Sequence, residues 1–440
     1  MSRQLHLGAF LMATGHHIAA WRHPSVPRGA GVDIAHYRAL ARLAESACFD
    51  LLFIADSLAA AEGPQAARMA RSDLFEPLTL LAALSGATER IGLVATVTTS
   101  YHEPFSVARA FASIDQLSGG RAGWNLVTSD AAAEAGNFGR DSHLGHAERY
   151  ARASEFQQVV NGLWDSWADD AFVRDQASGQ YYRADGVRAL DHRGDHFAVR
   201  GPLNVPRSPQ GRPVLVQAGA SPAGLGLAAR SAEVVFTAQP DLASAQAFYG
   251  DLKRRVTAAG RCPDSLKIMP GVYVTVAATA AEARAKEAEL RELVDPQVGI
   301  ALLGRMLGNF DLSNYPADGP LPELPLTDSG QQSRQRLLTD LARREQLSLA
   351  QLSQRIAGGR GHLSLVGSAG EVADVLQDWF EQGAADGFNL MAPLLPGGLE
   401  DIVQHLVPEL QRRGLFRDAY TGRTLREHLG LARPANPHFT

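Results

Sequence analysis

The sequence is poor in the residues that mark disulfide, metal and nucleic-acid functions. Its 440 residues include only two cysteines, Cys48 and Cys262, too few for a disulfide framework or a cysteine metal cluster. Lysine occurs three times, and a formal net charge of −5 does not favour a nucleic-acid partner. We therefore expect a cytoplasmic protein that acts on a small molecule and uses no metal.

Long hydrophobic runs are also absent. No stretch approaches the roughly 20 consecutive apolar residues of a membrane span, and the N-terminus lacks the apolar run of a signal peptide. We therefore expect no membrane association. With 45% hydrophobic and 20% charged residues, the composition is nevertheless that of a globular protein with a substantial core.

A glycine-rich dinucleotide motif is missing as well. No Gly-x-Gly-x-x-Gly sequence follows the first predicted strand, and the later GASPAG segment at 219–224 has a different spacing. That motif is typical of doubly wound folds that bind nicotinamide dinucleotides. Its absence argues against a nicotinamide-dependent dehydrogenase.

The clearest pattern that is present is a strand, a helix and a second strand. Residues 91–97 are apolar and β-branched, Pro104 opens a helical pattern, and residues 122–127 are again apolar. Such βαβ units build parallel sheets, in which ligands bind at the carboxyl ends of the strands. Thr96 and Tyr101 lie at or after the end of the first strand, so this unit predicts part of a site.

Eight strand patterns alternate with helical patterns along the chain. They lie near residues 5, 50, 91, 122, 214, 233, 268 and 387. This alternation is typical of an α/β fold of the (β/α)8 TIM-barrel type. We predict such a barrel, with insertions, as a single domain over residues 1–440.

Two segments interrupt the alternation. An excursion rich in Asp, Arg, Gly and Pro covers about 169–212, and a helical insertion covers about 295–361. We expect residues 362–367 to be a short apolar link. The polar and aromatic tail at 415–440 is expected to pack on a partner subunit, in a homodimer or homotetramer.

Two strand-to-helix junctions predict an anion site. His146 and Tyr150 are four residues apart at a helix start, and Ser221 precedes a proline at another. Helix N-termini present free N–H groups that suit a phosphate. The alternative is that these residues only cap their helices.

Other candidates lie at the ends of the first two strands. Asp56 follows the second strand, where it either faces the site or caps a turn. His16 and His17 follow the first strand and are candidates for substrate contact, as is Tyr101. A metal-dependent hydrolase with His16, His17 and Asp56 as ligands is an alternative, although no spaced His-x-His motif supports it.

At these residues the chain resembles the bacterial-luciferase-like flavin monooxygenases. It is most similar to the branch with nitrilotriacetate monooxygenase component A and dibenzothiophene-sulfone monooxygenase. The matching motifs are HLGAFLMATGHHIAAWRHP (6–24), FIADS (53–57), ERIGLVATVTTSYHEPFSVAR (89–109), LSGGRAGWNLVTS (117–129), NFG (137–139), HAERYARASEF (146–156), GLWDSW (162–167) and QAGASPAG (217–224).

The resemblance implies a TIM barrel that binds reduced FMN (FMNH2) from a separate NAD(P)H:flavin reductase. With O2 it would insert one oxygen atom into a small organic substrate, with a sulfur- or nitrogen-containing compound favoured. Carried over by motif, Asp56 and Thr96 would face the flavin ring, and His146, Tyr150 and Ser221 would hold the ribityl-phosphate end. No catalytic base is identified.

Two other functions fit the same fold. One is a non-catalytic flavin-binding barrel, and the other is an F420-dependent oxidoreductase. Consumption of O2 coupled to product formation with FMNH2 would distinguish both from a monooxygenase.

Overall fold

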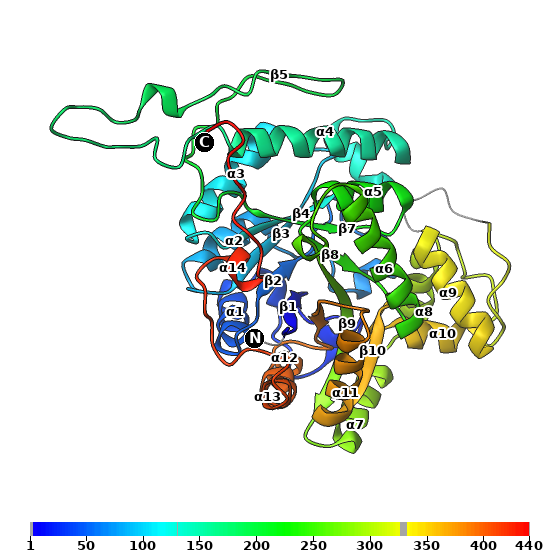
Figure 1. The fold of residues 1–440 in the computed structure, drawn as a ribbon. Helices are drawn as coiled ribbons and strands as arrows, with labels where there is room; N and C mark the ends of the chain where they lie inside the picture. The colour runs from blue at the N-terminus through cyan, green and yellow to red at the C-terminus, as the bar shows by residue number, and fades with distance from the viewer. Residues whose placement is uncertain (1–2, 130, 326–331, 440) are drawn as a thin grey trace.

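The computed structural model describes residues 3–129, 131–325 and 332–439, and its centre is a closed parallel barrel (Figure 1). Each barrel strand pairs in parallel with the next, and the last pairs with the first. The eight strands are β1 (His6–Leu11), β2 (Leu51–Ile54), β3 (Gly92–Thr98), β4 (Ala122–Val127), β7 (Val214–Ala218), β8 (Val234–Thr237), β9 (Lys267–Ala277) and β11 (Gly387–Met391). The predicted (β/α)8 barrel is confirmed.

Helices surround the barrel because their apolar stripes need a surface to cover. The helix α3, for example, starts at Pro104, buries Val107, Ala108 and Phe111, and is followed by Gly119 and Gly120, which both have positive φ. The surrounding helices are α1 (Ile34–Ser46), α2 (Pro77–Ser85), α3 (Pro104–Leu117), α4 (His146–Trp164), α5 (Pro222–Ser231), α6 (Leu242–Ala258), α7 (Ala280–Glu292), α11 (Ala369–Glu381), α12 (Gly397–Asp401), the π-helix η7 (Ile402–Leu406) and α13 (Val407–Arg412). No helix within the described ranges combines the length and apolarity needed to cross a bilayer.

The segment expected to be a short link is instead a strand. β10 (Leu363–Ser368) pairs in parallel with β9 over six residues, outside the closed barrel. β9 is long enough to pair with β8, β10 and β11 at once. The expectation of a link at 362–367 was therefore wrong.

The two interruptions of the barrel pattern take different forms. After α4 the chain forms an extended arm that projects beyond that helix and carries the short strands β5 (His192–Arg193) and β6 (Ala198–Val199) (Figure 1). Residues 295–361 contain α8 (Pro296–Met306), α9 (Gln332–Glu345) and α10 (Leu349–Ile356), which pack together in one hydrophobic cluster that also includes Ile18 and Met69. Residues 326–331 of this insertion lie outside the described part.

The C-terminal tail packs on its own barrel rather than extending away from it. The short helix α14 (Leu425–His428) places the fully buried Leu425 against the amino-terminal ends of the strands. A Cβ at Gly92 would lie 2.4 Å from a methyl group of Leu425, and one at Gly123 would lie 3.2 Å from the other. Glycine at both positions therefore lets the tail close this end of the barrel.

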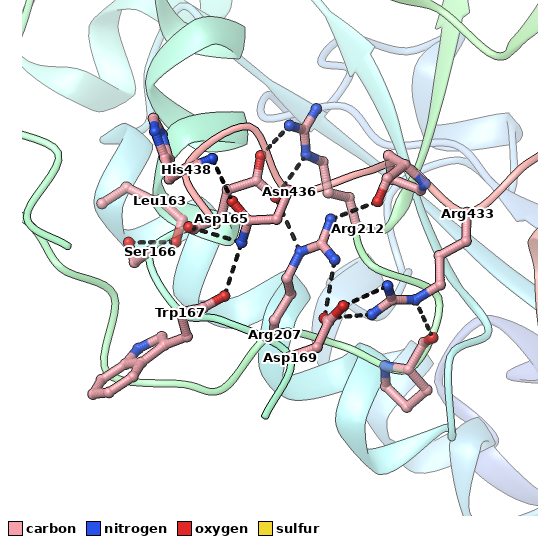
Figure 2. A network of polar contacts seen from close by, with 12 residues as sticks. Leu163, Asp165, Ser166, Trp167, Asp169, Arg207, Arg212, Arg433, Asn436 and His438 are labelled. Atoms are coloured by element: carbon pink, nitrogen blue, oxygen red, sulfur yellow. Dashed lines mark hydrogen bonds and ion pairs between the residues drawn. The ribbon is translucent and has the colours of Figure 1, made fainter. Parts of the chain in front are cut away.

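Ion pairs hold the last part of the tail beside the end of α4 (Figure 2). Arg433 donates to the carboxylate of Asp169 at 2.6 and 2.8 Å, and Asn436 donates to the carbonyl oxygens of Asp165 and Trp167. Asp165 in turn accepts from Arg207 at 3.1 Å. The tail therefore contacts its own chain, and its packing on a partner subunit stays a prediction.

Candidate active site

A cavity of about 400 Å³ opens at the carboxyl ends of β2, β3, β4 and β7. This is the end of a parallel barrel at which ligands bind. All five residues predicted to contact a flavin line it, although they come from segments up to 165 residues apart (221 − 56). They are Asp56, Thr96, His146, Tyr150 and Ser221.

One end of the cavity has the features of an anion site. His146 is the first residue of α4, and Ser221 is the N-cap of α5, where its Oγ accepts from the backbone N–H of Gly224 at 3.1 Å. The rings of His146 and Tyr150 have centroids 4.9 Å apart. Two helix N-termini and three side-chain donors therefore meet at this end.

Gly224 brings the two hydroxyl groups of this end together. A Cβ at that position would lie 3.0 Å from the phenol oxygen of Tyr150 and 3.2 Å from the Oγ of Ser221. A larger residue would displace one or both hydroxyls. The glycine in the GASPAG segment thus allows a compact group of donors.

Deeper in the cavity, polar side chains of neighbouring strands form a short chain of hydrogen bonds. Thr96 and Asn125 are partners in the β3–β4 register. The Asn125 amide donates to the Thr96 hydroxyl at 2.8 Å, and that hydroxyl donates to the Ile54 carbonyl at 2.9 Å. The Oδ1 of Asn125 is buried and has no hydrogen-bond partner within the described ranges, so it can accept from a bound ligand.

An aromatic wall forms another side of the cavity. Phe10, Phe53 and Phe236 come from β1, β2 and β8, and their ring centroids lie 5.0 to 5.6 Å apart. Such a surface suits a flat apolar ring system. These three residues were not predicted from the sequence, because their strands are apolar on both faces.

Two carboxyl groups face the cavity from its loop side. Burial raises the pKa of Asp56 to about 6, a value to which the hydrogen bond from the Ser57 backbone contributes a lowering and the nearby Glu76 and Glu134 a rise. Glu134 accepts from the Leu58 backbone N–H at 3.2 Å. Its other oxygen is buried without a partner in the described part of the chain. Glu134 was not predicted, because it lies in an alanine-rich loop.

The three residues predicted to contact substrate do not line this cavity. The ring of His16 is buried behind Phe10 and bonds to its carbonyl oxygen at 2.9 Å. His17 is also buried, and Tyr101 bonds to His143 at 2.5 Å and stacks on Phe138. Their contact with a substrate stays a prediction.

The metal-dependent alternative lacks a ligand cluster. Across the described ranges, no group of three or more His, Cys, Asp or Glu side chains is placed to hold a metal ion. His16, His17 and Asp56 therefore do not converge as the hydrolase alternative requires.

Comparison with known proteins gives the family. The model of the luciferase-like monooxygenases matches residues 10–386. The chain belongs to this family. The predicted family, fold and enzyme class are thereby confirmed, and the chain is a monooxygenase of the luciferase-like type.

Relatives match along almost the whole chain. Nitrilotriacetate monooxygenase component A of Aminobacter aminovorans is 50% identical over 99% of this chain and 98% of its own. N-acetyl-S-(2-succino)cysteine monooxygenase of Bacillus subtilis (strain 168) is 48% identical over 99% and 98%. The crystal structure of a riboflavin lyase with modified FMN and its substrate riboflavin has a TM-score of 0.86 at 31% identity, covering 100% of this chain and 97% of that one.

Proposed function

We propose that this protein is the oxygenase component of a two-component system. It would take reduced FMN from a separate NAD(P)H:flavin reductase and use O2 to insert one oxygen atom into a small organic substrate, preferably one that contains sulfur or nitrogen. The observation that carries the proposal is the convergence of Asp56, Thr96, His146, Tyr150 and Ser221 on one cavity.

The residues of the cavity fit the chemistry of FMN. His146, Tyr150 and Ser221, at two helix N-termini, would bind the phosphate. The unpartnered Oδ1 of Asn125 could accept from an imide N–H of the ring system. The aromatic wall would cover the ring itself, and the riboflavin lyase structure holds a modified FMN in a similar fold.

The contribution of the chain would be binding, orientation and exclusion of water. When bound, reduced FMN would supply the electrons that activate O2. Phe10, Phe53 and Phe236 would keep that side of the site dry. Asp56, with its pKa near 6, could hold or release a proton close to neutral pH, which makes it a candidate for proton transfer.

A separate reductase is part of the proposal for two reasons. The sequence has no glycine-rich dinucleotide motif after its first strand, so it offers no recognisable site for the electron donor. One relative is itself named as component A, which indicates a protein that works with another component.

The proposal is tested by supplying the missing partner. The purified protein is incubated with FMN, NADH, O2 and a generic flavin reductase against candidate substrates, and products are analysed by mass spectrometry. We expect a product heavier by one oxygen atom, labelled when ¹⁸O2 is used. Turnover with F420 and none with FMNH2, or flavin binding without any oxygenated product, would support the alternatives instead.

A further inference from the structure

Arg71 is a positively charged residue that contacts His16, whose ring lies behind the cavity-lining Phe10. Among the described residues, its guanidinium donates to the carbonyl oxygens of Ala70, at 3.1 Å, and His16, at 3.3 Å. No carboxylate within the described residues forms an ion pair with Arg71. Charged side chains that are largely removed from water are normally paired, and Arg71 is partly buried.

The charged neighbour that most affects Arg71 adds positive rather than negative charge. Burial and the nearby Arg305 together lower the pKa of Arg71 to about 10. Arg71 and Arg360 both disfavour protonation of His16, and Arg71 and Arg291 do the same for His17. Each of these neighbours is a cation or a neutral imidazole, so none supplies the negative charge that Arg71 lacks.

His17 adds an unpartnered donor. Its Nδ1 accepts from the backbone N–H of Ala19 at 3.3 Å, and burial lowers the pKa of the ring to about 4. The neutral ring therefore carries its proton on Nε2. That atom is buried and has no hydrogen-bond partner among the described residues. An oxygen atom of a ligand would satisfy it.

The position of Arg71 and His17 suits a substrate rather than the flavin. A second cavity, of about 710 Å³, is lined by the loop from Ser57 to Met69 and by Ala301 and Arg305 of α8. Ser57 also lines the flavin cavity, so the two spaces adjoin. Arg71 and His17 lie next to this cavity rather than in its lining: Arg71 follows the lining residue Met69 by two positions and is partly exposed.

We propose that the substrate carries a carboxylate group and that Arg71 binds it, with Arg305 and the Nε2 proton of His17 as further contacts. The guanidinium fork matches a carboxylate in geometry and charge. The inference rests on the proposed function, since it concerns the substrate of the same site. The inference also gives His17 a role, as a hydrogen-bond donor to the substrate. Two relatives are named for substrates that carry carboxylates, which supports the inference.

Binding without flavin tests this inference independently of the proposed function. Calorimetric titrations at low salt use nitrilotriacetate, N-acetyl-S-(2-succino)cysteine and succinate as probes, each against its uncharged amide or methyl ester. We expect at least one acid to bind the full-length protein and its neutral analogue to bind at least tenfold more weakly. Failure of all three acids to bind would overturn the inference.

Three variants identify the residue responsible. We expect Arg71→Met to weaken binding of the acid at least tenfold, Arg71→Lys to recover part of the loss, and Arg305→Met to have a smaller effect. Arg183→Met is the control, since Arg183 lies in the projecting arm and pairs with Asp170. Unchanged binding in Arg71→Met would contradict the assignment.

Two readouts separate ligand binding from a structural role. Because Arg71 lacks a counter-charge, Arg71→Met should unfold at a temperature no lower than that of the wild type, whereas a marked fall would show that Arg71 supports the fold. FMN affinity should be the same in both proteins. Failure of the wild-type protein to bind FMN would instead refute the proposed function, and the result of the carboxylate titration would still stand.

Discussion

His146 and Ser221 show how single residues build the site from helix ends. Each lies at the start of a helix, and each could be read from the sequence as a simple cap. What the sequence could not show is that both starts face the same cavity, with Tyr150 between them. That convergence depends on the closure of the barrel, which no local pattern encodes.

The remaining residues of the cavity were harder to predict. Phe10, Phe53 and Phe236 lie in strands that are apolar on both faces, so periodicity does not say which side chains point into the barrel. Asn125 could have been selected, because it is a polar residue inside a buried strand. A single polar residue in an apolar strand is therefore a useful signal.

We predict that His146→Ala lowers FMN affinity by about tenfold or more, through loss of one phosphate contact. Its effect on folding should be small, because the ring is only half-buried at a helix start. Fluorescence titration and thermal unfolding measure the two effects. His405→Ala, in η7 and away from the cavity, is the control. An equal loss of stability and affinity would argue for a purely structural role.

The raised pKa of Asp56 predicts a pH dependence of stability. Its carboxyl group keeps its proton in the folded state up to a pKa of about 6, whereas in the unfolded chain it ionises near the ordinary aspartate pKa of 3.8. The stabilisation is therefore complete below pH 4 and is lost as the pH rises through 6.

Asp56→Asn should remove this dependence. Between pH 4.5 and 7.5, urea unfolding should show the free energy of unfolding of the wild type falling relative to the variant by about 1 kcal/mol, a value reduced for partial exposure. A constant difference between the two proteins across this range would mean that Asp56 ionises normally.

At the scale of secondary-structure elements, the eight barrel strands could be predicted from the sequence, whereas the strand β10 could not. The eight barrel strands are short apolar runs buried on both sides, which gives them a strong signal. β10 lies outside the barrel, and most of its residues are only partly buried. Its weaker apolar pattern made it look like a link.

The tail shows a different limit of prediction. Residues 415–439 contain few long apolar runs, so their sequence does not reveal what they cover. The structure shows that Leu425 fills the amino-terminal end of the barrel opposite two glycines. The tail is therefore part of the core.

We predict that Leu425→Ala lowers the free energy of unfolding by about 3 kcal/mol, as expected for a fully buried leucine whose site cannot collapse. Leu117→Ala, at a position that is 66% exposed, should change it by less than about 0.5 kcal/mol. Chemical denaturation of both variants measures the difference. Similar values would show that the tail detaches readily from the barrel.

At the scale of the whole molecule, exposed large side chains on the projecting arm are relevant to the oligomeric state. Val173, Tyr181 and Tyr182 expose 42, 62 and 43% of their surfaces on it, more than large apolar side chains usually do. This supports the prediction of a homodimer or homotetramer. Sedimentation should give a mass of two or four 47.1 kDa chains, and Tyr181→Ser with Tyr182→Ser should reduce it. A wild-type monomer would refute the prediction.

The central proposal is that one cavity binds FMN with its phosphate at the starts of α4 and α5. The most direct measurement compares FMN with riboflavin, which lacks the phosphate, in equilibrium binding to the wild type and to His146→Ala. We predict that FMN binds the wild type at least tenfold more tightly and that most of this preference is lost in the variant. Equal affinity for the two flavins, or a preference unchanged by the substitution, would contradict the account.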